Sequence, residues 1–412
     1  MIRPISKSAA GLDVHKAVVV CTLIQEQSNG CLSKESREYK AFNADLLNLA
    51  KWLKTEEVQT VAMESTGIYW KKVYEAIEDI GIKSDVVNAR HIKNVPGRKT
   101  DISDSEWIAE LARCGLLKPS FIPPKDIRQL RLLTRYRKKL SGVLTAEKNR
   151  MHKILETMGI KLSCVVSNIN GVSATRMIEA ILSNEKPEKI AEYAIGNLKR
   201  KKSEIIRSIE GYQLSDRDQF LLKKLLEHIQ WIMMQLSEID KQIVVAMEPY
   251  DKQWKILQTL PGIDVISAAM LISEIGVDMS VFASSNHFCS WAGMCPGNNE
   301  SAGKRKSGKT RKGNRYLRAL MCEVANAAIK TNSQFKGKYK ALVIRRGHKR
   351  AVVAVGHKML KIIYSMLKTG QPYKDPGIDY ESLMVKKNAP RWIKALKNYG
   401  YLNQENIVEQ PA

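Results

Sequence analysis

Residues 299–318, NESAGKRKSGKTRKGNRYLR, place a serine at the front edge of a dense run of positive charge. From residue 304 to residue 318 the chain has eight Lys or Arg and no acid, and glycines stand at 303, 308 and 313. Such a loop can cradle a phosphate, whereas Ser301 could instead attack one. No histidine stands beside Ser301 to accept its proton, so the loop by itself is interpreted as a phosphate cradle. The candidate nucleic-acid contacts in this loop are Lys304, Arg305, Lys306, Lys309, Arg311, Lys312, Arg315 and Arg318.

Four acids stand where predicted strands and a predicted helix begin or end. Asp13 lies inside an apolar strand, Glu64 ends another, and Asp101 and Asp104 open a helix three residues apart. An acid in such a strand is costly to bury unless it is paired or bound to metal. Together the four carboxylates could hold two Mg²⁺ ions, which clamp the attacking and leaving oxygens of a phosphodiester. For any single acid a structural role is the better interpretation: Asp101 or Ser103 as a helix cap, Asp104 as a helix-dipole partner. For the set, a metal site is favoured.

The elements that must position these acids alternate between strand and helix. β-branched residues predict a strand, a tight turn and a second strand over residues 9–24. The following predicted elements are a strand near 37–42, a helix at 44–55, a strand at 58–66, a helix at 69–81, a strand at 83–89 and a helix at 104–117. This order predicts an α/β domain with a mixed sheet covered by helices.

The rest of the chain is predicted to be helical. Apolar spacing predicts one long helix after Pro123–Pro124 and another over 220–247, with shorter helical segments between them at about 173–212. This pattern favours an antiparallel coiled-coil arm. In the C-terminal third the sequence predicts helices at 315–330 and 345–367. The glycine- and asparagine-rich part before them is predicted to be a loop. On the first long helix, the side chains that could face a backbone phosphate, or only water, are Arg128, Arg131, Arg135 and Lys139.

Positive charge is concentrated in two parts of the chain. The 412 residues carry a net charge of +25. Residues 304–371 hold 19 basic residues against Glu323 alone, and residues 123–153 hold ten against two acids. These two stretches account for the whole excess of positive charge. Positive charge concentrated in this way is typical of a protein that binds a polyanion, most often a nucleic acid.

Several other classes of protein are disfavoured. No apolar run is long enough for a membrane span, and the first residues lack the apolar core of a signal peptide. The seven cysteines and seven histidines are scattered and form no C-x-x-C pair. We therefore expect reduced thiols, a cytoplasmic location and no zinc site.

Six short motifs follow one another in an order that is more specific than any one of them. They are GLDVHK, MESTGIYW, RKTDISDSEWIAEL, LPGIDVISA, WAGMCPGNNESAGK and KGNRYLRALMCEVANAA. Together they resemble the DEDD transposases of bacterial insertion sequences, the IS-one-ten family, which also includes the Piv-type DNA invertases. The resemblance spans roughly residues 9–370.

This resemblance implies a RuvC-like or RNase H-like N-terminal fold and assigns Asp13, Glu64, Asp101 and Asp104 to a Mg²⁺-binding acidic site. It also implies that Ser301, in a P-x(3–5)-S-x-G setting, is the nucleophile that forms a phosphoserine link to DNA. Ser307 fits that motif less well. The implied partners are donor and target DNA, a structured noncoding bridge RNA, and further copies of the chain as dimers that pair into tetramers. The implied location is the bacterial cytoplasm, in association with the nucleoid.

The predicted organisation has four parts: the RuvC-like domain at 1–122, the coiled-coil arm at 123–250, the helical transposase domain with the serine loop at 251–372, and a tail at 373–412 that matches nothing. Two other functions stay open. A RuvC-like nuclease or junction resolvase would hydrolyse DNA with water and leave no covalent adduct. A non-enzymatic nucleic-acid-binding protein would use the acids structurally and would not cleave.

Overall fold

A computed structural model describes residues 4–65, 67–95, 103–169, 171–297, 299–308, 310 and 312–401. The chain divides into two compact units, Met1–Lys125 and Asp126–Ala412. The predicted boundaries at residues 122, 250 and 372 remain predictions. Among the described residues, no helix combines the length and the apolar character that a bilayer crossing requires.

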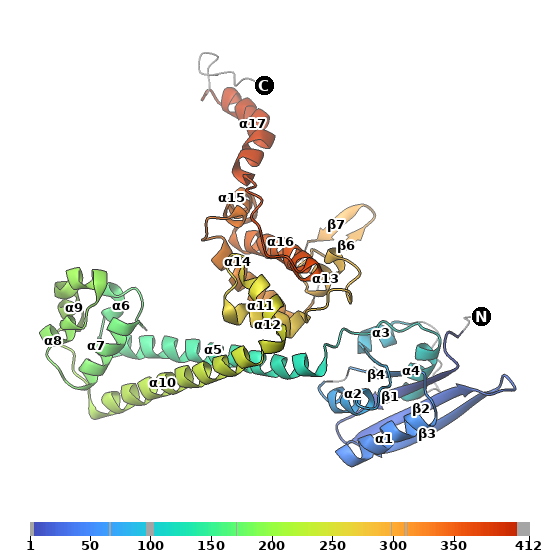
Figure 1. Cartoon of the computed structure of the whole chain (residues 1–412). Coiled ribbons are helices and arrows are strands. Elements are labelled where there is room, and N and C mark those ends of the chain that lie inside the picture. The colour runs from blue at the N-terminus through green and yellow to red at the C-terminus, as the bar shows by residue number, and fades with distance from the viewer. Residues whose placement is uncertain are drawn as a thin grey trace. The chain divides into compact units, whose positions relative to one another are not determined.

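The first unit is built on a five-stranded mixed sheet with the strand order β3-β2-β1-β4-β5 (Figure 1). The first three strands pair antiparallel, and β4 and β5 run parallel to β1. The strands are β1 (Ser8–Val14), β2 (Val18–Glu26), β3 (Leu32–Lys40), β4 (Thr60–Glu64) and β5 (Ser84–Val87). The helices are α1 (Asn43–Thr55), α2 (Trp70–Glu78), α3 (Ala89–Lys93) and α4 (Asp104–Arg113). The predicted α/β domain with a mixed sheet is therefore confirmed.

Side-chain alternation along β1 divides the interior of this unit into two cores. Leu12 and Val14 belong to the apolar cluster that includes Leu49 of α1 and Ile77 of α2. Ala9, on the other face of β1, joins a second cluster with Trp107, Ile108 and Leu111 of α4. Because successive strand residues point to opposite faces, Gly11 and Asp13 lie on the face that α4 covers.

Gly11 is the point at which α4 meets the sheet. A β-carbon built at Gly11 would lie 2.1 Å from the carbonyl oxygen of Ser105 and 2.2 Å from the backbone nitrogen of Ala109. Both contacts are to backbone, so no side-chain rotation could relieve them. Glycine at this position is therefore what lets the start of α4 approach the strand that carries Asp13.

The second unit begins with two long helices, α5 (Lys125–Thr157) and α10 (Asp216–Val245). Arg137 pairs with Asp240, and Glu147 lies 4.0 Å from His228. As the residue number rises on α5, its contact on α10 falls, so the helices run antiparallel, as predicted. Between them lie α6 (Leu162–Val165), α7 (Val172–Leu182), α8 (Pro187–Glu192), η1 (Gly196–Lys201) and α9 (Lys202–Ile209).

The short helices form a cap with a core of its own. This core joins residues of α7 and α9 to Met151 and Leu155 of α5 and to Leu222 and Ile229 of α10. The cap therefore packs where α5 ends and α10 begins (Figure 1). It fixes the pairing of the two long helices at that end.

The remainder of the second unit is also mostly helical. Its elements are η2 (Glu248–Tyr250), α11 (Asp251–Gln258), α12 (Val265–Ile275), α13 (Ser285–Trp291), β6 (Asn299–Ser301), β7 (Lys304–Ser307), α14 (Arg315–Ala328), α15 (Gln334–Arg346), α16 (His348–Thr369) and α17 (Tyr380–Asn398). α16 is central to this part, because α13, α14 and α15 all pack against it. Met321, Val355, Met359 and Ile363 are buried at these contacts.

The predicted loop around Ser301 is a β-hairpin, which corrects the sequence analysis. Asn299 pairs with Ser307, and Ser301 pairs with Lys304 across a two-residue turn. Both turn residues have positive φ, 49° at Ala302 and 72° at Gly303, as in the primed turns that close tight hairpins. The sequence offers little sign of this hairpin, since its strands have three and four residues and Ala-Gly is not a typical primed-turn pair.

We expect Gly11→Ala to destabilise the first unit, because the added methyl group must push α4 away from β1. The free energy of unfolding should fall by at least about 1–3 kcal/mol, the usual cost of overpacking. Urea unfolding followed by circular dichroism measures this. Gly142→Ala is the matched control, since a β-carbon there, within α5, meets nothing within 4 Å. A stability equal to that of the control would contradict the close approach of α4 to Gly11.

Candidate functional site

The parallel pairing of β1 and β4 brings Asp13 and Glu64 to neighbouring strand positions. Leu12 is in register with Met63, and the next residue on each strand is the acid. Leu12 and Met63 share the core on the α1 and α2 side, so the two acids point toward the α4 side. Both side chains are partly exposed at this edge of the sheet. The structure thus brings together two of the four predicted acids.

The start of α4 lies over the same strand. The helix is capped by Ser103, whose hydroxyl oxygen accepts a hydrogen bond from the backbone N–H of Glu106 at 3.3 Å. Asp104 is the first helical residue and is exposed. It directly precedes Ser105, whose carbonyl lies against Gly11. The cap is thus assigned to Ser103, and the carboxylate of Asp104 is not the group that caps the helix.

Asp101, the fourth predicted acid, lies outside the described residues. Within the described ranges, no group of three or more His, Cys, Asp and Glu side chains is arranged to hold a metal ion. The donor set of Asp13, Glu64 and Asp104 consists of carboxylate oxygens, which fit Mg²⁺ by chemistry. The two-metal site therefore stays a prediction.

His15 is a neighbour of Asp13 that the sequence analysis missed. Its Nε2 atom lies 3.0 Å from Oδ2 of Asp13, and its side chain is 63% exposed. The backbone N–H of His15 donates to the carbonyl of Val18, which closes the turn between β1 and β2. The signal was the D-x-H spacing, because strand alternation places residues i and i+2 on one face. One oxygen of Asp13 thus has a hydrogen-bonding neighbour within the same unit.

The backbone of the Ser301 hairpin is tied to the helices at its base. Pro296 and Thr310 form a further antiparallel bridge below β6 and β7. A β-carbon at Gly313 would lie 2.3 Å from the backbone nitrogen of Gly293 and 2.6 Å from the carbonyl carbon of Ala292. The chain entering the hairpin and the chain leaving it therefore touch, backbone to backbone. The turn residues Ala302 and Gly303 are exposed at the other end.

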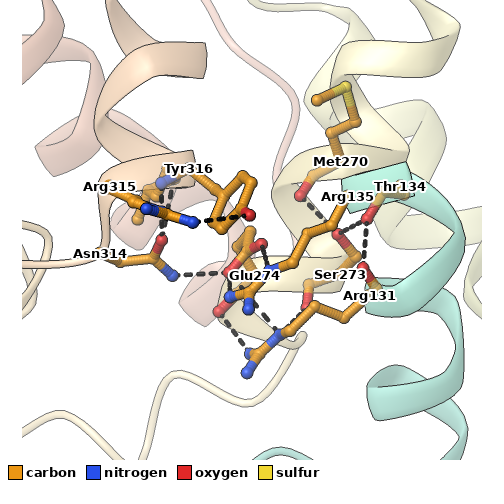
Figure 2. Close-up of polar contacts among 10 residues, drawn as sticks. Arg131, Thr134, Arg135, Met270, Ser273, Glu274, Asn314, Arg315 and Tyr316 are labelled. Carbon is orange, nitrogen blue, oxygen red and sulfur yellow. Dashed lines mark hydrogen bonds and ion pairs between the residues drawn. The ribbon is translucent and has the colours of Figure 1, made fainter. Parts of the chain in front are cut away.

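Directly after this contact, Asn314 fixes the start of α14. Its Oδ1 atom accepts hydrogen bonds from the backbone N–H groups of Tyr316 and Leu317, at 3.0 and 3.1 Å. Its Nδ2 atom donates to Oε2 of Glu274 at 2.6 Å (Figure 2). The side-chain amide of Asn314 thus caps the N-terminus of α14 and links it to Glu274 of α12.

Glu274, near the end of α12, is the centre of a buried polar network. Its side chain is 4% exposed and receives two hydrogen bonds from Arg135 of α5, at 2.7 and 2.9 Å (Figure 2). Burial opposes ionisation, but the hydrogen bonds from Arg135 and Asn314 and the charge of Arg131 outweigh it and hold the pKa of Glu274 below its usual range. The carboxylate is therefore ionised and fully partnered.

Arg131 of α5 binds the C-terminal end of α12, the helix that carries Glu274. It donates to the backbone carbonyls of Ser273 and Glu274, at 2.8 and 2.9 Å. Such carbonyls at a helix C-terminus lack partners within the helix, and a cation there also suits the helix dipole. Burial lowers the pKa of Arg131 to about 10, despite the attraction of Glu274. Arg135 also stacks on the ring of Tyr316, 4.3 Å from its centre.

These contacts change how the basic stretch 123–153 is interpreted. At least six of its ten cations have a carboxylate partner: Lys125, Arg131, Arg135, Arg137, Lys138 and Arg150. The partners Asp240, Glu274 and Glu323 belong to other helices far along the chain, so a local charge count missed them. The predicted phosphate contacts Arg131 and Arg135 are thus placed within the Glu274 network, where each has a structural role.

The other predicted nucleic-acid contacts have different surroundings. Lys139, Lys312 and Arg315 are exposed, and Arg128 and Arg318 are partly buried. Lys309 and Arg311 lie outside the described residues. Lys304, Arg305 and Lys306 form the first three residues of β7, so their backbone positions are set by the hairpin. Their role as nucleic-acid contacts remains a prediction.

Sequence comparison matches two segments of the chain to models of transposase families. A family model described as "Transposase" matches residues 10–160, which include the acidic strands and α4. A second, described as "Transposase IS116/IS110/IS902 family", matches residues 254–340, which include α12 and the Ser301 hairpin. The chain belongs to the IS116/IS110/IS902 transposase family.

Individual relatives agree with this membership. The transposase for insertion sequence element IS1111A from Coxiella burnetii is 26% identical over 77% of this chain and 80% of its own length. The transposase for insertion sequence element IS1328 from Yersinia enterocolitica is 23% identical over 79% of this chain and 88% of its own. Among solved structures, RuvC of Thermus thermophilus aligns with 27% of this chain and 99% of its own length, at 15% identity and a TM-score of 0.22.

We expect Glu274→Gln to destabilise the transposase strongly, because it removes a buried carboxylate and leaves two partly buried guanidinium groups without their counter-charge. The loss should be about 3 kcal/mol, in the range for a broken buried ion pair. Denaturant unfolding measures it. The matched control is Glu323→Gln, whose side chain is 56% exposed and pairs with Lys138, so its effect should stay under about 1 kcal/mol. Equal effects of the two substitutions would show that the Glu274 network is not a stabilising centre.

Proposed function

We propose that this transposase breaks and rejoins DNA strands through a covalent link between Ser301 and a DNA phosphate. The observation that carries the proposal is the place of Ser301, at the end of β6 beside an exposed two-residue turn, within the segment matched by the transposase family. A small residue and a glycine follow it, so a sugar–phosphate backbone can come close to this point without meeting a bulky side chain.

The proposed step is a transesterification at phosphorus. The Oγ atom of Ser301 attacks, a P–Oγ bond forms, and the bond from phosphorus to one sugar oxygen breaks. The serine proton leaves, and the sugar oxygen takes up a proton. Because one phosphodiester replaces another, a second sugar hydroxyl can reverse the step and join a new strand without ATP. Lys304, Arg305 and Lys306 follow directly in β7 and supply positive charge for the transition state.

The acidic edge of the first unit completes the proposed chemistry. Asp13 and Glu64, at neighbouring strand positions, and Asp104, at the start of α4, would hold Mg²⁺ together with Asp101. Bound Mg²⁺ supplies Lewis-acid stabilisation of the phosphate oxygens and eases loss of the nucleophile's proton. Asp13 and Glu64 project from paired strands, and Gly11 lets the start of α4 approach them. Their carboxylates are therefore held on rigid elements and not on a flexible loop.

The proposed substrates are the donor and target DNA of an insertion sequence. The family resemblance further supports guidance by a structured bridge RNA and the assembly of dimers into tetramers, in which the acidic site of one protomer meets the serine of another. With sequence read by RNA pairing, the protein itself needs to recognise backbone and shape more than bases.

The first test of this function is a covalent adduct. Reactions on a nicked DNA substrate, stopped with denaturant, should yield a protein–DNA band that survives denaturing electrophoresis, with the modified peptide mapping to residues 299–304. Ser301→Ala should lower adduct formation by roughly 10³-fold or more while DNA binding persists. Ser307→Ala, at the far end of the same hairpin, is the control and should retain the adduct. DNA cleavage without any adduct would support the hydrolytic nuclease instead.

The second test concerns the acids. We expect Asp13→Asn, Glu64→Gln and Asp104→Asn each to lower Mg²⁺-dependent strand transfer by roughly 10²-fold or more, since loss of a residue that merely supports a metal ligand already costs about 10- to 100-fold. Nucleic-acid affinity should change by less than about threefold, because no positive charge is removed. Glu35→Gln removes an exposed carboxylate from β3 and serves as the control. Full strand transfer in one of the three variants would assign that acid to packing or capping.

A further inference from the structure

The two helices α15 and α16 hold the largest run of positive charge without an acid in the second unit. Residues 334–369 contain ten Lys or Arg and no Asp or Glu. In residues 304–371 the single acid is Glu323 of α14, and its carboxylate pairs with Lys138 of α5. The contrast with α5 is direct, because most cations of that helix have carboxylate partners.

Three lysines of these helices come together where α15 packs on α16. The helices form an antiparallel hairpin about Gly347, so Lys338 of α15 lies across from the segment that carries Lys358 and Lys361. All three side chains are partly buried, and none of them is ion-paired to a carboxylate within the described part of the chain. Burial, followed by the charges of Lys358 and Lys361, lowers the pKa of Lys338 to about 8.

An open cavity of about 330 Å³ lies beside two of these lysines. Its lining includes Lys358, Lys361 and Lys374 together with the hydroxyl groups of Ser365 and Thr369. Ammonium groups are donors suited to the oxygens of a phosphate, whereas the hydroxyl of Thr369 already donates to the backbone carbonyl of Ser365 at 2.8 Å.

The acid nearest in sequence to this lining does not neutralise the lysines. Asp375 accepts hydrogen bonds from the backbone N–H groups of Gln334 and Gly377, at 3.0 and 2.9 Å. It therefore closes the chain segment after α16, and within the described residues it forms no ion pair with Lys358, Lys361 or Lys374. His357 adds no further positive charge at neutral pH, because burial and the neighbouring Lys361 and Lys338 lower its pKa.

We propose that Lys338, Lys358 and Lys361 form a phosphate-binding site that holds the sugar–phosphate backbone of a nucleic acid at the junction of α15 and α16. Partly buried like charges without a counter-ion raise the free energy of the protein, and a bound phosphodiester removes that repulsion. The proposal rests on the proposed function for its nucleic-acid partner, and it names a contact surface separate from the serine hairpin.

The test replaces all three lysines with glutamine and measures binding of labelled duplex DNA and of a structured RNA with the same number of phosphates. Fluorescence anisotropy over a series of salt concentrations gives affinity and its salt dependence. We expect affinity for at least one probe to fall roughly 10- to 100-fold near 0.1 M salt. The slope of log K against log salt should become shallower by about two to three, since each phosphate that the protein neutralises adds close to 0.9 to that slope. The probe whose affinity falls in the glutamine variant, relative to wild type, shows whether the site holds a DNA or an RNA backbone.

The matched control removes the same charge elsewhere in the second unit. Lys161, Lys189 and Lys202 pair with Glu156, Glu185 and Glu192, at 2.6, 3.1 and 2.5 Å, and their triple glutamine variant should bind within about threefold of wild type. A second variant with arginine at 338, 358 and 361 should keep the affinity, because the charge remains. Thermal unfolding of the glutamine variant should be unchanged or higher, since repulsion is removed.

The possible outcomes separate this site from the catalytic proposal. If the Lys338, Lys358 and Lys361 variant binds both probes with the same affinity and salt slope as the control triple, the phosphate site is wrong, even while wild type forms the Ser301 adduct. If wild type binds neither probe, both proposals fail. Weaker binding by the glutamine variant with full binding by the arginine variant supports the site, whatever the result of the adduct test.

Discussion

The ionised carboxylate of Glu274 is the interaction on which the second unit depends. It receives hydrogen bonds from Arg135 of α5 and Asn314 at the start of α14, while Arg131 covers the last carbonyls of its own helix. The side chain is only 4% exposed, and its charge is tolerated there because both carboxylate oxygens accept hydrogen bonds. The same contacts join the long-helix arm to the helices that hold the Ser301 hairpin, so arm and hairpin belong to one structural unit.

Close backbone contacts at two glycines also position elements near the candidate catalytic residues. At Gly11 the sheet admits α4, and at Gly313 the end of the hairpin segment meets Gly293. Each contact excludes even a methyl group, so each fixes a separation that packing of side chains alone would leave adjustable. Gly11 lies two residues before Asp13, and Gly313 follows the strand that faces Ser301. Glycine at these two positions therefore permits the close backbone approach on which the placement of these groups depends.

Positive charge has two different fates in this protein. Along α5 the cations are mostly neutralised by acids from other helices, which stabilises the arm and leaves fewer charges for a ligand. On α15 and α16, within the part of the chain that the structure describes, three partly buried lysines lie together without a carboxylate partner. Two segments with a similar density of Lys and Arg thus differ in role. In α5 the cations form a structural network with acids, and on α15 and α16 the proposed role of the three lysines is to bind an anion.

The sequence by itself determined the strand and helix order of the first unit apart from the short helix α3, because period-two and period-3.6 patterns depend only on neighbouring residues. It also determined the two long helices and the family that the motifs resemble, while the assignment of the acids and the serine to a catalytic site stays a prediction. Tertiary structure decided that Asp13 and Glu64 are neighbours, since that depends on the register of β1 against β4. It also decided that residues 299–307 form a hairpin and that Arg131 and Arg135 bind at the end of α12, around Glu274. These outcomes depend on residues far apart in the chain, and a local pattern carries no information about which distant group will arrive beside it.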